Sequence, residues 1–486
     1  MMEALIRLPE LEKKRSENEQ IHYMDHIFDT QKAAFERNPV PDAGERIRHL
    51  TTLKEKLLEH QEAIIAAIDQ DFGGRSRNES LLAEILPSVE GIRYTVKRVR
   101  KWMQPSRRKV GLLFQPGGAR VVYQPLGLVG IIVPWNYPVY LALGPLTGAL
   151  SAGNRVMIKM SEYTPRTAAA LKKMLYEAFD EDHVAVVTGE ADVGVAFSRK
   201  PWDHLVFTGS TAVGRQVMKS AADNLTPVTL ELGGKSPAII GPDAPIRDAA
   251  QRIAFGKVFN AGQTCVAPDY VLCPRGAVDR FVESFSSAVA GMYPSLVDNP
   301  HYTGIINERQ HQRLQGLVTD AAEKGARITT INPAGEDFSE TRKMPVRVMT
   351  EVDESMRILQ EEIFGPLLPV IPYDTLKDAV AYVNKHPRPL ALYYFDYDRE
   401  KVDYVVSRTF AGGMVVNDTL AHVAQDDLPF GGVGPSGMGE YHGHEGFLAF
   451  SKAKGVLYKQ RLNSTGLIYP PYGRWIHRLI YRLFLR

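Results

Sequence analysis

The stretch Leu128-Val129-Gly130-Ile131-Ile132-Val133 is a continuous apolar run that ends at Pro134-Trp135-Asn136-Tyr137-Pro138. A short, uninterrupted run rich in β-branched residues is typical of a strand that is buried on both faces of a parallel sheet. The prolines interrupt this strand, because proline cannot donate to a ladder of hydrogen bonds. Asn136 is therefore expected just beyond the carboxyl end of a buried strand.

The residues that follow alternate between strand and helix patterns. Expected strands are Arg155–Lys159, Val184–Val187 and His204–Phe207, and expected helices are Arg166–Ala178 and Ala212–Ala222. This alternation predicts a parallel, doubly wound α/β sheet. Ligands bind such sheets beyond the carboxyl ends of the strands, and Asn136, Lys159, Gly189 and Gly209 all fall there.

A second α/β unit is predicted after Glu231. Its expected strands are 270–272, 367–371, 390–395 and 413–416, and its expected helices are 249–258, 278–290 and 376–384. Before the first strand, residues 21–108 have apolar residues at helical spacing. We expect these helices to pack as a scaffold, with no catalytic role.

The composition is that of a soluble globular protein, with 44% hydrophobic and 23% charged residues. The length of 486 residues suggests two or three domains, and the net charge of +2 gives no reason to expect nucleic acid as a partner. With 2 cysteines the chain fits a reducing compartment. Residues 1–20 lack the apolar core of a signal peptide, and no stretch reaches the roughly 20 apolar residues that span a bilayer. We therefore expect a cytoplasmic protein.

Two segments have strand patterns outside both units. Residues 119–123 and 455–458 alternate polar and apolar side chains. We expect them to form an antiparallel flap that can lie across a subunit interface, and hence a homodimer.

The end of the chain is basic and amphipathic. Arg474, Arg478, Arg482 and Arg486 recur every four residues, while apolar residues follow helical spacing. Such a helix can make a peripheral contact with an anionic membrane surface, or it can dock on the body of the protein. We favour docking.

Cys265 lies in the small, polar segment Phe259-Asn260-Ala261-Gly262-Gln263-Thr264-Cys265. A thiolate there would be a strong nucleophile, and Glu231 in Leu230-Glu231-Leu232-Gly233-Gly234-Lys235 is a carboxylate that can act as its base. Composition alone favours a buried, inert cysteine, but the surrounding segments reverse that preference. The cysteines and histidines lack zinc-site spacing, so we expect no metal.

The segment Phe207-Thr208-Gly209-Ser210-Thr211-Ala212-Val213-Gly214 indicates a nucleotide site. A strand ends there, a glycine allows close backbone approach, and the free amides of the following helix favour a pyrophosphate. The segment is not the Gly-x-Gly-x-x-Gly fingerprint, and alone it is typical of an ordinary helix cap.

Three further features are ambiguous when each is taken alone. Lys159 and Glu162 can bind ribose hydroxyls or form a solvated ion pair. Glu362 and Phe364 can hold a nicotinamide ribose or merely end a strand. Asn136 can donate an N–H to an oxyanion, or its side chain can merely stabilise the turn in which it lies.

Six segments together resemble the NAD(P)-dependent aldehyde dehydrogenase superfamily, in family order and over nearly the whole chain. They are Pro134-Trp135-Asn136, Lys159 to Glu162, Gly209 to Gly214, Glu231 to Lys235, Gly262 to Cys265 and Glu361 to Pro366. The segment Pro429 to Gly443 resembles the class 3 branch. Tyr469-Pro470-Pro471-Tyr472-Gly473 and the basic tail are most similar to coniferyl aldehyde dehydrogenases within that branch.

The resemblance implies catalytic roles for three residues. Cys265 would attack the aldehyde, and Asn136 and the Cys265 backbone N–H would hold the resulting oxyanion. After hydride transfer, Glu231 would activate the water that hydrolyses the thioester. A rival is a CoA-acylating enzyme, whose members generally lack this base, and another is a protein that keeps the fold without catalysis.

The implied cofactor is NAD, because Glu162 would repel a 2′-phosphate, with NADP also possible. The pyrophosphate would lie near Ser210 and Thr211, the adenosine ribose on Lys159 and Glu162, and the nicotinamide ribose on Glu362. The full set of expected cofactor contacts is Trp135, Lys159, Glu162, Gly209, Ser210, Thr211, Gly214, Glu362 and Phe364.

Tyr137 is the expected substrate contact. Aromatic residues near the presumed mouth suit an aromatic or long apolar aldehyde, and the resemblance favours a coniferyl-type aldehyde over medium- or long-chain aliphatic ones.

The implied fold is α/β, with two doubly wound parallel-sheet domains and a small β oligomerisation flap. We expect a Rossmann-like cofactor domain with N-terminal helices at 1–111 and 126–230, and a catalytic domain at 231–448. The flap comprises residues 112–125 and 449–462, and the C-terminal tail comprises residues 463–486.

Overall fold

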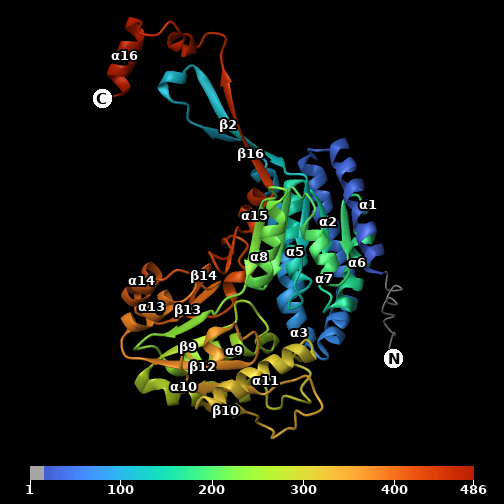
Figure 1. Ribbon diagram of the computed structural model, residues 1–486, viewed down its shortest axis with the longest axis vertical. Coiled ribbons are helices and arrows are strands. Elements are labelled where there is room, and N and C mark those ends of the chain that lie inside the picture. The colour runs from blue at the N-terminus through green and yellow to red at the C-terminus, as the bar shows by residue number, and fades with distance from the viewer. Residues whose placement is uncertain (1–15, 486) are drawn as a thin grey trace.

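The computed structural model describes residues 16–485, which form two large sheets covered by helices and a small sheet that projects from them (Figure 1). Residues 1–15, the start of the expected cofactor domain, and Arg486 of the tail lie outside the described residues. The α/β class that the sequence predicts is confirmed.

The N-terminal region is helical, as predicted. Its elements are α1 (Glu17–Arg37), α2 (Ala43–Phe72), α3 (Arg77–Ser80), the π-helix η1 (Leu81–Ile85) and α4 (Leu86–Trp102). Ser16 and Glu19 form a capping box that begins α1. Gly73, at a φ of 64°, ends α2 in the left-handed conformation that glycine adopts without steric cost.

The first large sheet has six strands in the order β15-β7-β6-β3-β4-β5. Its strands are β3 (Leu128–Ile132), β4 (Arg155–Lys159), β5 (Val184–Val187), β6 (His204–Gly209), β7 (Val228–Leu232) and β15 (Gly437–Met438). Its crossover helices are α5 (Tyr140–Ala152), α6 (Pro165–Ala178), α7 (Ala191–Ser198) and α8 (Thr211–Ala222). The core on one face contains α2, α4, α5 and α6, and the core on the other contains α1, α7 and α8. The sheet is therefore doubly wound.

The second large sheet has seven strands in the order β10-β11-β12-β9-β8-β13-β14. Its strands are β8 (Pro237–Ile240), β9 (Tyr270–Pro274), β10 (Arg327–Ile331), β11 (Val346–Thr350), β12 (Leu367–Tyr373), β13 (Ala391–Phe395) and β14 (Gly413–Val416). The accompanying helices are α9 (Ile246–Val258), α10 (Val278–Met292), α11 (Glu308–Glu323), α12 (Arg357–Gln360), α13 (Leu376–Lys385) and α14 (Arg399–Arg408). The later helix α15 (Gly443–Ala449) packs instead on α4 and α5 of the first sheet. Short 3₁₀ helices are η3 (Phe259–Gly262), η4 (Arg275–Ala277) and η5 (Ala421–Ala424).

Each large sheet is parallel except for one antiparallel edge strand. These edge strands are β15, which pairs with β7, and β10, which pairs with β11. The expected domain boundary at residue 231 falls inside β7, and β15 returns from the expected catalytic part to complete the first sheet. A boundary after Leu232 keeps β7 whole.

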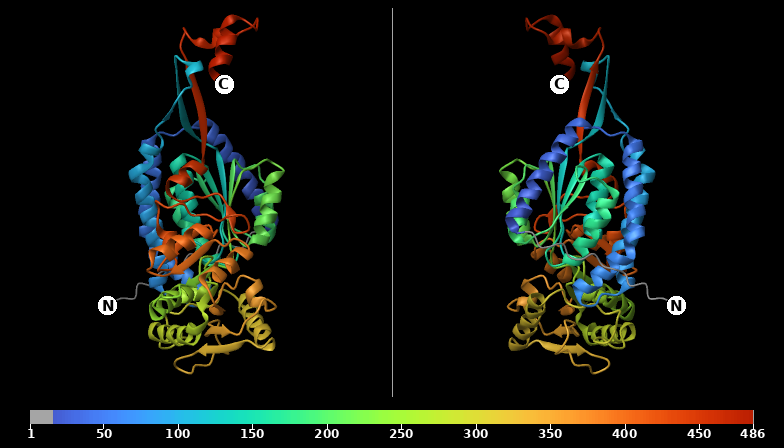
Figure 2. Two further views of the ribbon diagram at one scale, coloured as in Figure 1. Left: turned by 90° about the vertical axis from the view of Figure 1, so that its left-hand side faces the viewer. Right: turned by 90° about the vertical axis from the view of Figure 1, so that its right-hand side faces the viewer.

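The small sheet is the predicted antiparallel flap, and its pairing is confirmed. Its strands are β1 (Ser106–Arg108), β2 (Gly117–Pro125) and β16 (Ser451–Lys459), in the order β1-β2-β16. Val121 pairs with Gly455 in the centre of the β2–β16 ladder. Together with the 3₁₀ helices η2 (Leu112–Phe114) and η6 (Ser464–Ile468), this sheet forms an arm that extends away from both large sheets (Figures 1 and 2).

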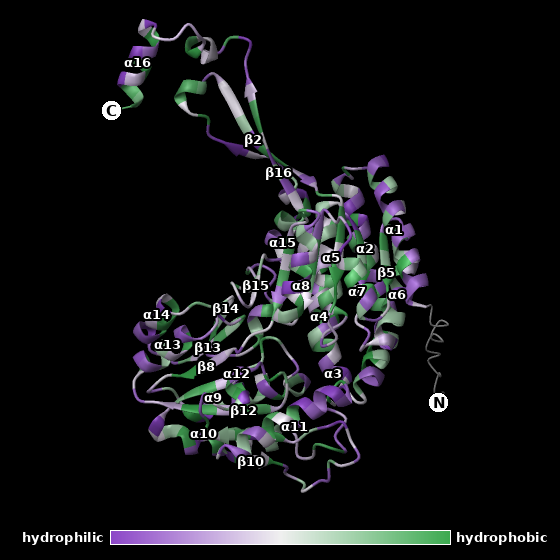
Figure 3. Ribbon diagram, in the orientation of Figure 1, coloured by the Kyte–Doolittle hydropathy of each residue, from purple (hydrophilic) through white to green (hydrophobic). Residues whose placement is uncertain are grey.

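The tail forms the predicted amphipathic helix, α16 (Trp475–Phe484), with apolar and polar residues on different sides (Figure 3). The expectation that it docks on the body of its own chain is wrong. It packs on η6 at the far end of the arm, because β16 carries the chain away from the body before α16 begins (Figures 1 and 2). Among residues 16–485, no helix has the length and apolar character that crossing a membrane requires.

This placement predicts that α16 contributes little to the stability of the body of the chain. A chain that ends at Gly473 should unfold within about 2 °C of the full-length protein in scanning calorimetry, because only His477 of α16 is buried. A fall of more than about 5 °C would show that α16 packs on a larger surface, in its own subunit or in a second one.

Candidate active site

Asn136 lies directly after β3, as the sequence predicts, and it is buried. Its backbone oxygen accepts a hydrogen bond from Asn260 Nδ2 at 3.3 Å. Among residues 16–485, no hydrogen-bond partner is seen for the Asn136 carboxamide, which is therefore available to a ligand. The next residue, Tyr137, shares a hydrogen bond of 2.6 Å between its hydroxyl and Thr264 Oγ1.

The loop that leads to Cys265 is strained and tightly held. Asn260 and Ala261 have φ values of 52° and 51°, which cost free energy for residues with a side chain. Gly262 continues at 74°, and a Cβ there would lie 2.3 Å from the oxygen of Gly365, so only glycine fits. The Gln263 side chain fixes this shape by donating to the oxygens of Asn260 and Gly304, each at 3.0 Å.

These contacts bring the Asn136 segment and the Cys265 loop together. One link joins Asn260 to the Asn136 oxygen, and the other joins Thr264, the neighbour of Cys265, to Tyr137. The predicted nucleophile and the predicted oxyanion donor thus lie in two segments that are bonded to each other.

Glu231 lies on β7, between Thr208 of β6 and Gly437 of β15. Both of its carboxyl oxygens are buried, and neither has a hydrogen-bond partner within the described residues. Burial raises the pKa of Glu231 well above its ordinary value, and the charge of Glu440 raises it further. A buried, unpartnered carboxyl group of raised pKa is suited to accept a proton.

The Cys265 thiol lies within the electrostatic reach of two of the predicted carboxylates. Burial raises its pKa to about 12, and the negative charges of Glu362 and Glu231 contribute to the rise. The thiol is therefore neutral at pH 7 in the free protein, and a base has to remove its proton before it can attack.

The predicted pyrophosphate site is a free helix N-terminus. Ser210 caps α8 by accepting from Val213 N at 3.4 Å, and Thr211 Oγ1 donates to the oxygen of Pro435 at 3.1 Å. Within the part of the chain that the structure describes, the backbone amides of Thr211 and Ala212 have no partner, so they can bind an anion. A Cβ on Gly214 would lie 2.5 Å from Leu232 Cδ2, so α8 packs directly on β7.

The predicted ribose-binding pair is present at the end of β4. Lys159 Nζ lies 3.3 Å from Glu162 Oε2, with the lysine buried and Glu162 partly exposed. Burial lowers the pKa of Lys159, and Glu162 opposes that change. The pair lies at the carboxyl edge of the sheet, beside β5. Lys159 offers N–H donors there and Glu162 offers an acceptor, and together these groups fit the hydroxyls of a ribose.

The remaining predicted cofactor residues gather around a bend at Phe364, whose φ is 51°. The rings of Trp135 and Phe364 meet edge to face at 5.2 Å. Burial raises the pKa of Glu362 to about 8, and Asp269 adds to the effect. These residues, with Gly209 at the end of β6, form donor, acceptor and apolar surfaces that fit an NAD-type dinucleotide.

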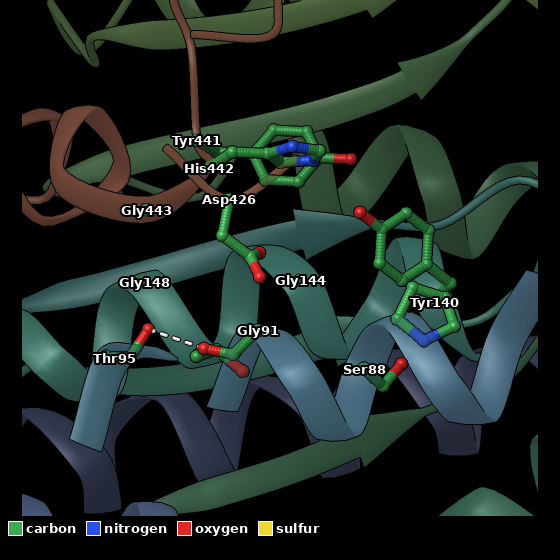
Figure 4. A pocket seen from close by; sticks show the side chains of 12 residues that line it. Ser88, Gly91, Thr95, Tyr140, Gly144, Gly148, Asp426, Tyr441, His442 and Gly443 are labelled. Carbon is green, nitrogen blue, oxygen red and sulfur yellow. Dashed lines mark hydrogen bonds between the residues drawn. The ribbon is translucent and has the colours of Figure 1, made fainter. Parts of the chain in front are cut away.

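A small cavity lies between α4, α5 and residues 441–443 (Figure 4). Tyr140 and Asp426 line it, and burial raises the pKa of Asp426 to about 6. Tyr441 Oη and both ring nitrogens of His442 are buried, with no partner among residues 16–485. Burial raises the pKa of Tyr441, and the nearby ionisable groups of Glu231 and Cys265 contribute to the rise, so the cavity borders the candidate active site.

Three charged residues that support this site were not predicted from the sequence. Arg75, Glu79 and Glu84 come from the N-terminal helical region, for which we expected no catalytic role. Glu79 accepts from Asn260 N at 3.2 Å and from Thr303 Oγ1 at 2.6 Å. The available signal was the Gly73-Gly74 break in the helical pattern immediately before Arg75.

One group of possible metal ligands occurs in the described part of the chain, away from the predicted site residues. Glu59, His60 and Glu177 place their donor atoms within 4.8 Å of one another. Lys56 already pairs with both Glu59 and Glu177, and the carboxylates are exposed. This cluster is better described as a surface ion-pair network.

Residues 14–456 match the model of the aldehyde dehydrogenase family. The chain is 60% identical to a probable coniferyl aldehyde dehydrogenase of Pseudomonas aeruginosa, over 96% of this chain and 98% of that protein. It is 49% identical to a coniferyl aldehyde dehydrogenase of Pseudomonas sp. strain HR199, over 92% and 93% of the two chains.

Solved structures of relatives have the same fold. A substrate-bound AldH of Staphylococcus aureus has a TM-score of 0.89 and 35% identity, over 95% of this chain and 99% of that one. An aldehyde dehydrogenase of Mycobacterium tuberculosis complexed with NAD+ has a TM-score of 0.82 and 32% identity, over 91% of each chain. The chain belongs to the aldehyde dehydrogenase family. The resemblance that the six sequence segments indicate is confirmed.

The raised pKa of the thiol predicts how Cys265 reacts with iodoacetamide. The alkylation rate should rise about tenfold per pH unit from pH 7 to pH 9, because the thiolate fraction rises in that proportion well below the pKa. The rate is measured by mass spectrometry of the peptide that contains Cys265. The Cys273→Ser variant is the control and should react alike, since Cys273 is buried. A rate that is constant above pH 7 would contradict the prediction.

Proposed function

We propose that this enzyme oxidises an aromatic, coniferyl-type aldehyde to its carboxylic acid with NAD(P)+, through a thioester on Cys265. The observation that carries the proposal is the pair of hydrogen bonds that joins the Asn136 segment to the Cys265 loop, with the charge of Glu231 acting on the same thiol. A nucleophile, an oxyanion donor and a base in one place are the requirements of this chemistry.

In the first step the sulfur of Cys265 forms a bond to the aldehyde carbon, and the carbonyl oxygen becomes an oxyanion. The Asn136 carboxamide, which has no other partner within the described residues, and the backbone N–H of Cys265 donate to that oxyanion. The thiol proton passes to solvent water as this bond forms, so Glu231 remains unprotonated for the second step. When bound, NAD(P)+ would supply the acceptor for the hydride that leaves the same carbon, and a thioester would remain on Cys265.

In the second step Glu231 accepts a proton from water, and the resulting hydroxide attacks the thioester carbon. The carbon–sulfur bond breaks, the acid leaves, and Cys265 regains its proton. The raised pKa of Glu231 favours this role, because a carboxylate of higher pKa accepts a proton more readily.

The cofactor proposal is supported by the chemistry of the residues present. The free amides at the start of α8 would hold the pyrophosphate, Lys159 and Glu162 the adenosine ribose, and Glu362 the nicotinamide ribose. Glu162 favours NAD over NADP, since its carboxylate would repel a 2′-phosphate. The relative from Mycobacterium tuberculosis that was solved with NAD+ supports the same assignment.

The substrate proposal is supported by two relatives named as coniferyl aldehyde dehydrogenases and by the aromatic surroundings of the site. Tyr137 is placed next to the Cys265 loop, and Trp135 and Phe364 pack against each other nearby. The alternative is a medium- or long-chain aliphatic aldehyde, which the same apolar surfaces would accept. A CoA-acylating reaction is disfavoured, because Glu231 provides the base that hydrolysis needs.

We also infer a homodimer formed through the arm. Apolar residues of the arm are exposed in the single chain, among them Leu457 at 54%, Leu462 at 84% and Trp475 at 70%. Exposed apolar surface on this scale is typical of an interface. Peripheral contact of α16 with a membrane is the other proposal for the same surface.

Glu231→Gln should separate the two chemical steps. The variant keeps Cys265 and should release a burst of about one NADH per active site, followed by a steady rate about 10² to 10⁴ lower than that of the wild type. Stopped-flow absorbance measures both phases. Cys265→Ser should show neither phase, and an unchanged steady rate in Glu231→Gln would remove Glu231 as the base.

The proposed substrate class predicts the order of kcat/KM values. Coniferaldehyde and other cinnamaldehydes should exceed hexanal and decanal by at least about tenfold, which corresponds to about 1.4 kcal/mol of additional transition-state binding. The values are measured with NAD+ and with NADP+ at one pH. Higher values for the aliphatic aldehydes would support the alternative substrate class.

A further inference from the structure

Arg75 and Glu84 form an ion pair that is completely removed from water. Arg75 Nη1 lies 3.0 Å from Glu84 Oε1, and both side chains have 0% exposure. Burying two charges is costly, and the attraction between them repays that cost only with good geometry and further hydrogen bonds. The additional partners of this pair therefore indicate what it does.

Both members of the pair bind the segment that contains Asn136. Arg75 Nη1 donates to the backbone oxygen of Asn136 at 3.0 Å. Glu84 Oε2 accepts from the amides of Val139 at 2.7 Å and Tyr140 at 3.0 Å, where α5 begins. The pair thus holds this segment at Asn136 and again three residues later.

Local structure places each charge for this contact. Glu84 lies in the π-helix η1, between α3 and α4, and single π-helical turns are frequent at functional sites. Arg75 follows the Gly73-Gly74 break at the end of α2. Its guanidinium lies over the rings of Phe72 at 5.0 Å and Tyr137 at 4.8 Å, which restricts its orientation.

The bond from Arg75 acts at a junction between two segments. The same Asn136 oxygen accepts from Asn260 in the loop that leads to Cys265. A shift of this oxygen would move the Asn136 carboxamide relative to the sulfur. A misplacement of about 1 Å can cost about 10²-fold in rate.

We propose that Arg75, oriented by Glu84, is a positioning residue that holds the Asn136 carboxamide in place for the oxyanion formed at Cys265. The proposal rests on the function proposed above for Asn136 and Cys265. Arg75 touches neither substrate nor cofactor in this scheme, and its effect passes through the Asn136 backbone oxygen.

The test is the double variant Arg75→Met/Glu84→Gln, which removes both charges together. Glutamine keeps an oxygen for the amides of Val139 and Tyr140, so the fold should survive, as thermal unfolding will show. We expect kcat to fall about 10- to 100-fold, less than the roughly 10²- to 10³-fold cost of losing an oxyanion donor outright. KM should change less than about threefold, because the lost interaction acts in the transition state.

A matched control and a conservative variant accompany this measurement. Arg77→Met, two residues away, removes an exposed arginine that pairs with Glu62 and should leave kcat unchanged. Arg75→Lys keeps a charged donor for Glu84 and should recover part of the lost kcat.

The decisive comparison repeats the double variant in an Asn136→Ala background. If Arg75 acts through Asn136, the double variant should cause no further loss there. If the double variant lowers kcat by the same factor in the Asn136→Ala background as in the wild type, Arg75 has a merely structural role and the inference is overturned. A wild-type kcat for the double variant would also overturn it while leaving the proposed function intact. A wild-type kcat for Asn136→Ala alone would instead remove the proposed role of Asn136, and with it the inference.

Discussion

The backbone oxygen of Asn136 is the point on which the geometry of the active site depends. It accepts hydrogen bonds from Arg75, between α2 and α3, and from Asn260, in the loop before Cys265. Three distant parts of the sequence therefore meet at one acceptor. The bond between Tyr137 and Thr264 adds a second link, so the segment after β3 and the nucleophile loop are fixed relative to each other.

The electrostatic surroundings of Cys265 follow from this close packing. Burial raises the pKa values of Cys265, Glu231 and Glu362, and the carboxylates reinforce the effect on the thiol. Burial makes the resting thiol less reactive and makes the Glu231 carboxylate a stronger base, so this environment suits the proposed hydrolysis of the thioester.

Sequence reasoning predicted the elements that have simple patterns. The apolar runs at β3, β5 and β6 are strands, because residues buried on both faces of a sheet must be apolar. It missed β7 as a strand, since Glu231 interrupts the apolar pattern there. It also missed β15, because a strand of two residues that pairs with β7 across the chain has no local signal.

The candidate site was predictable only where a motif marks it. The segments around Asn136, Glu231 and Cys265 are recognisable, and the structure brings them together. Arg75 and Glu84 were not predictable, because an arginine and a glutamate in a helical region are usually solvated, and only the tertiary fold shows that they are buried together. The position of α16 was wrong for a similar reason: its amphipathic pattern predicts a helix, but the pattern does not specify which surface the helix contacts.

The most direct test of the proposed reaction is to trap its covalent intermediate. Glu231→Gln is mixed with coniferaldehyde and NAD+, quenched in acid and analysed by peptide mass spectrometry. The peptide that contains Cys265 should carry the acyl group of the corresponding acid as a thioester, and the peptide that contains Cys273 should not. An acyl group on another residue, or NADH formation with no acylation of Cys265, would contradict the account.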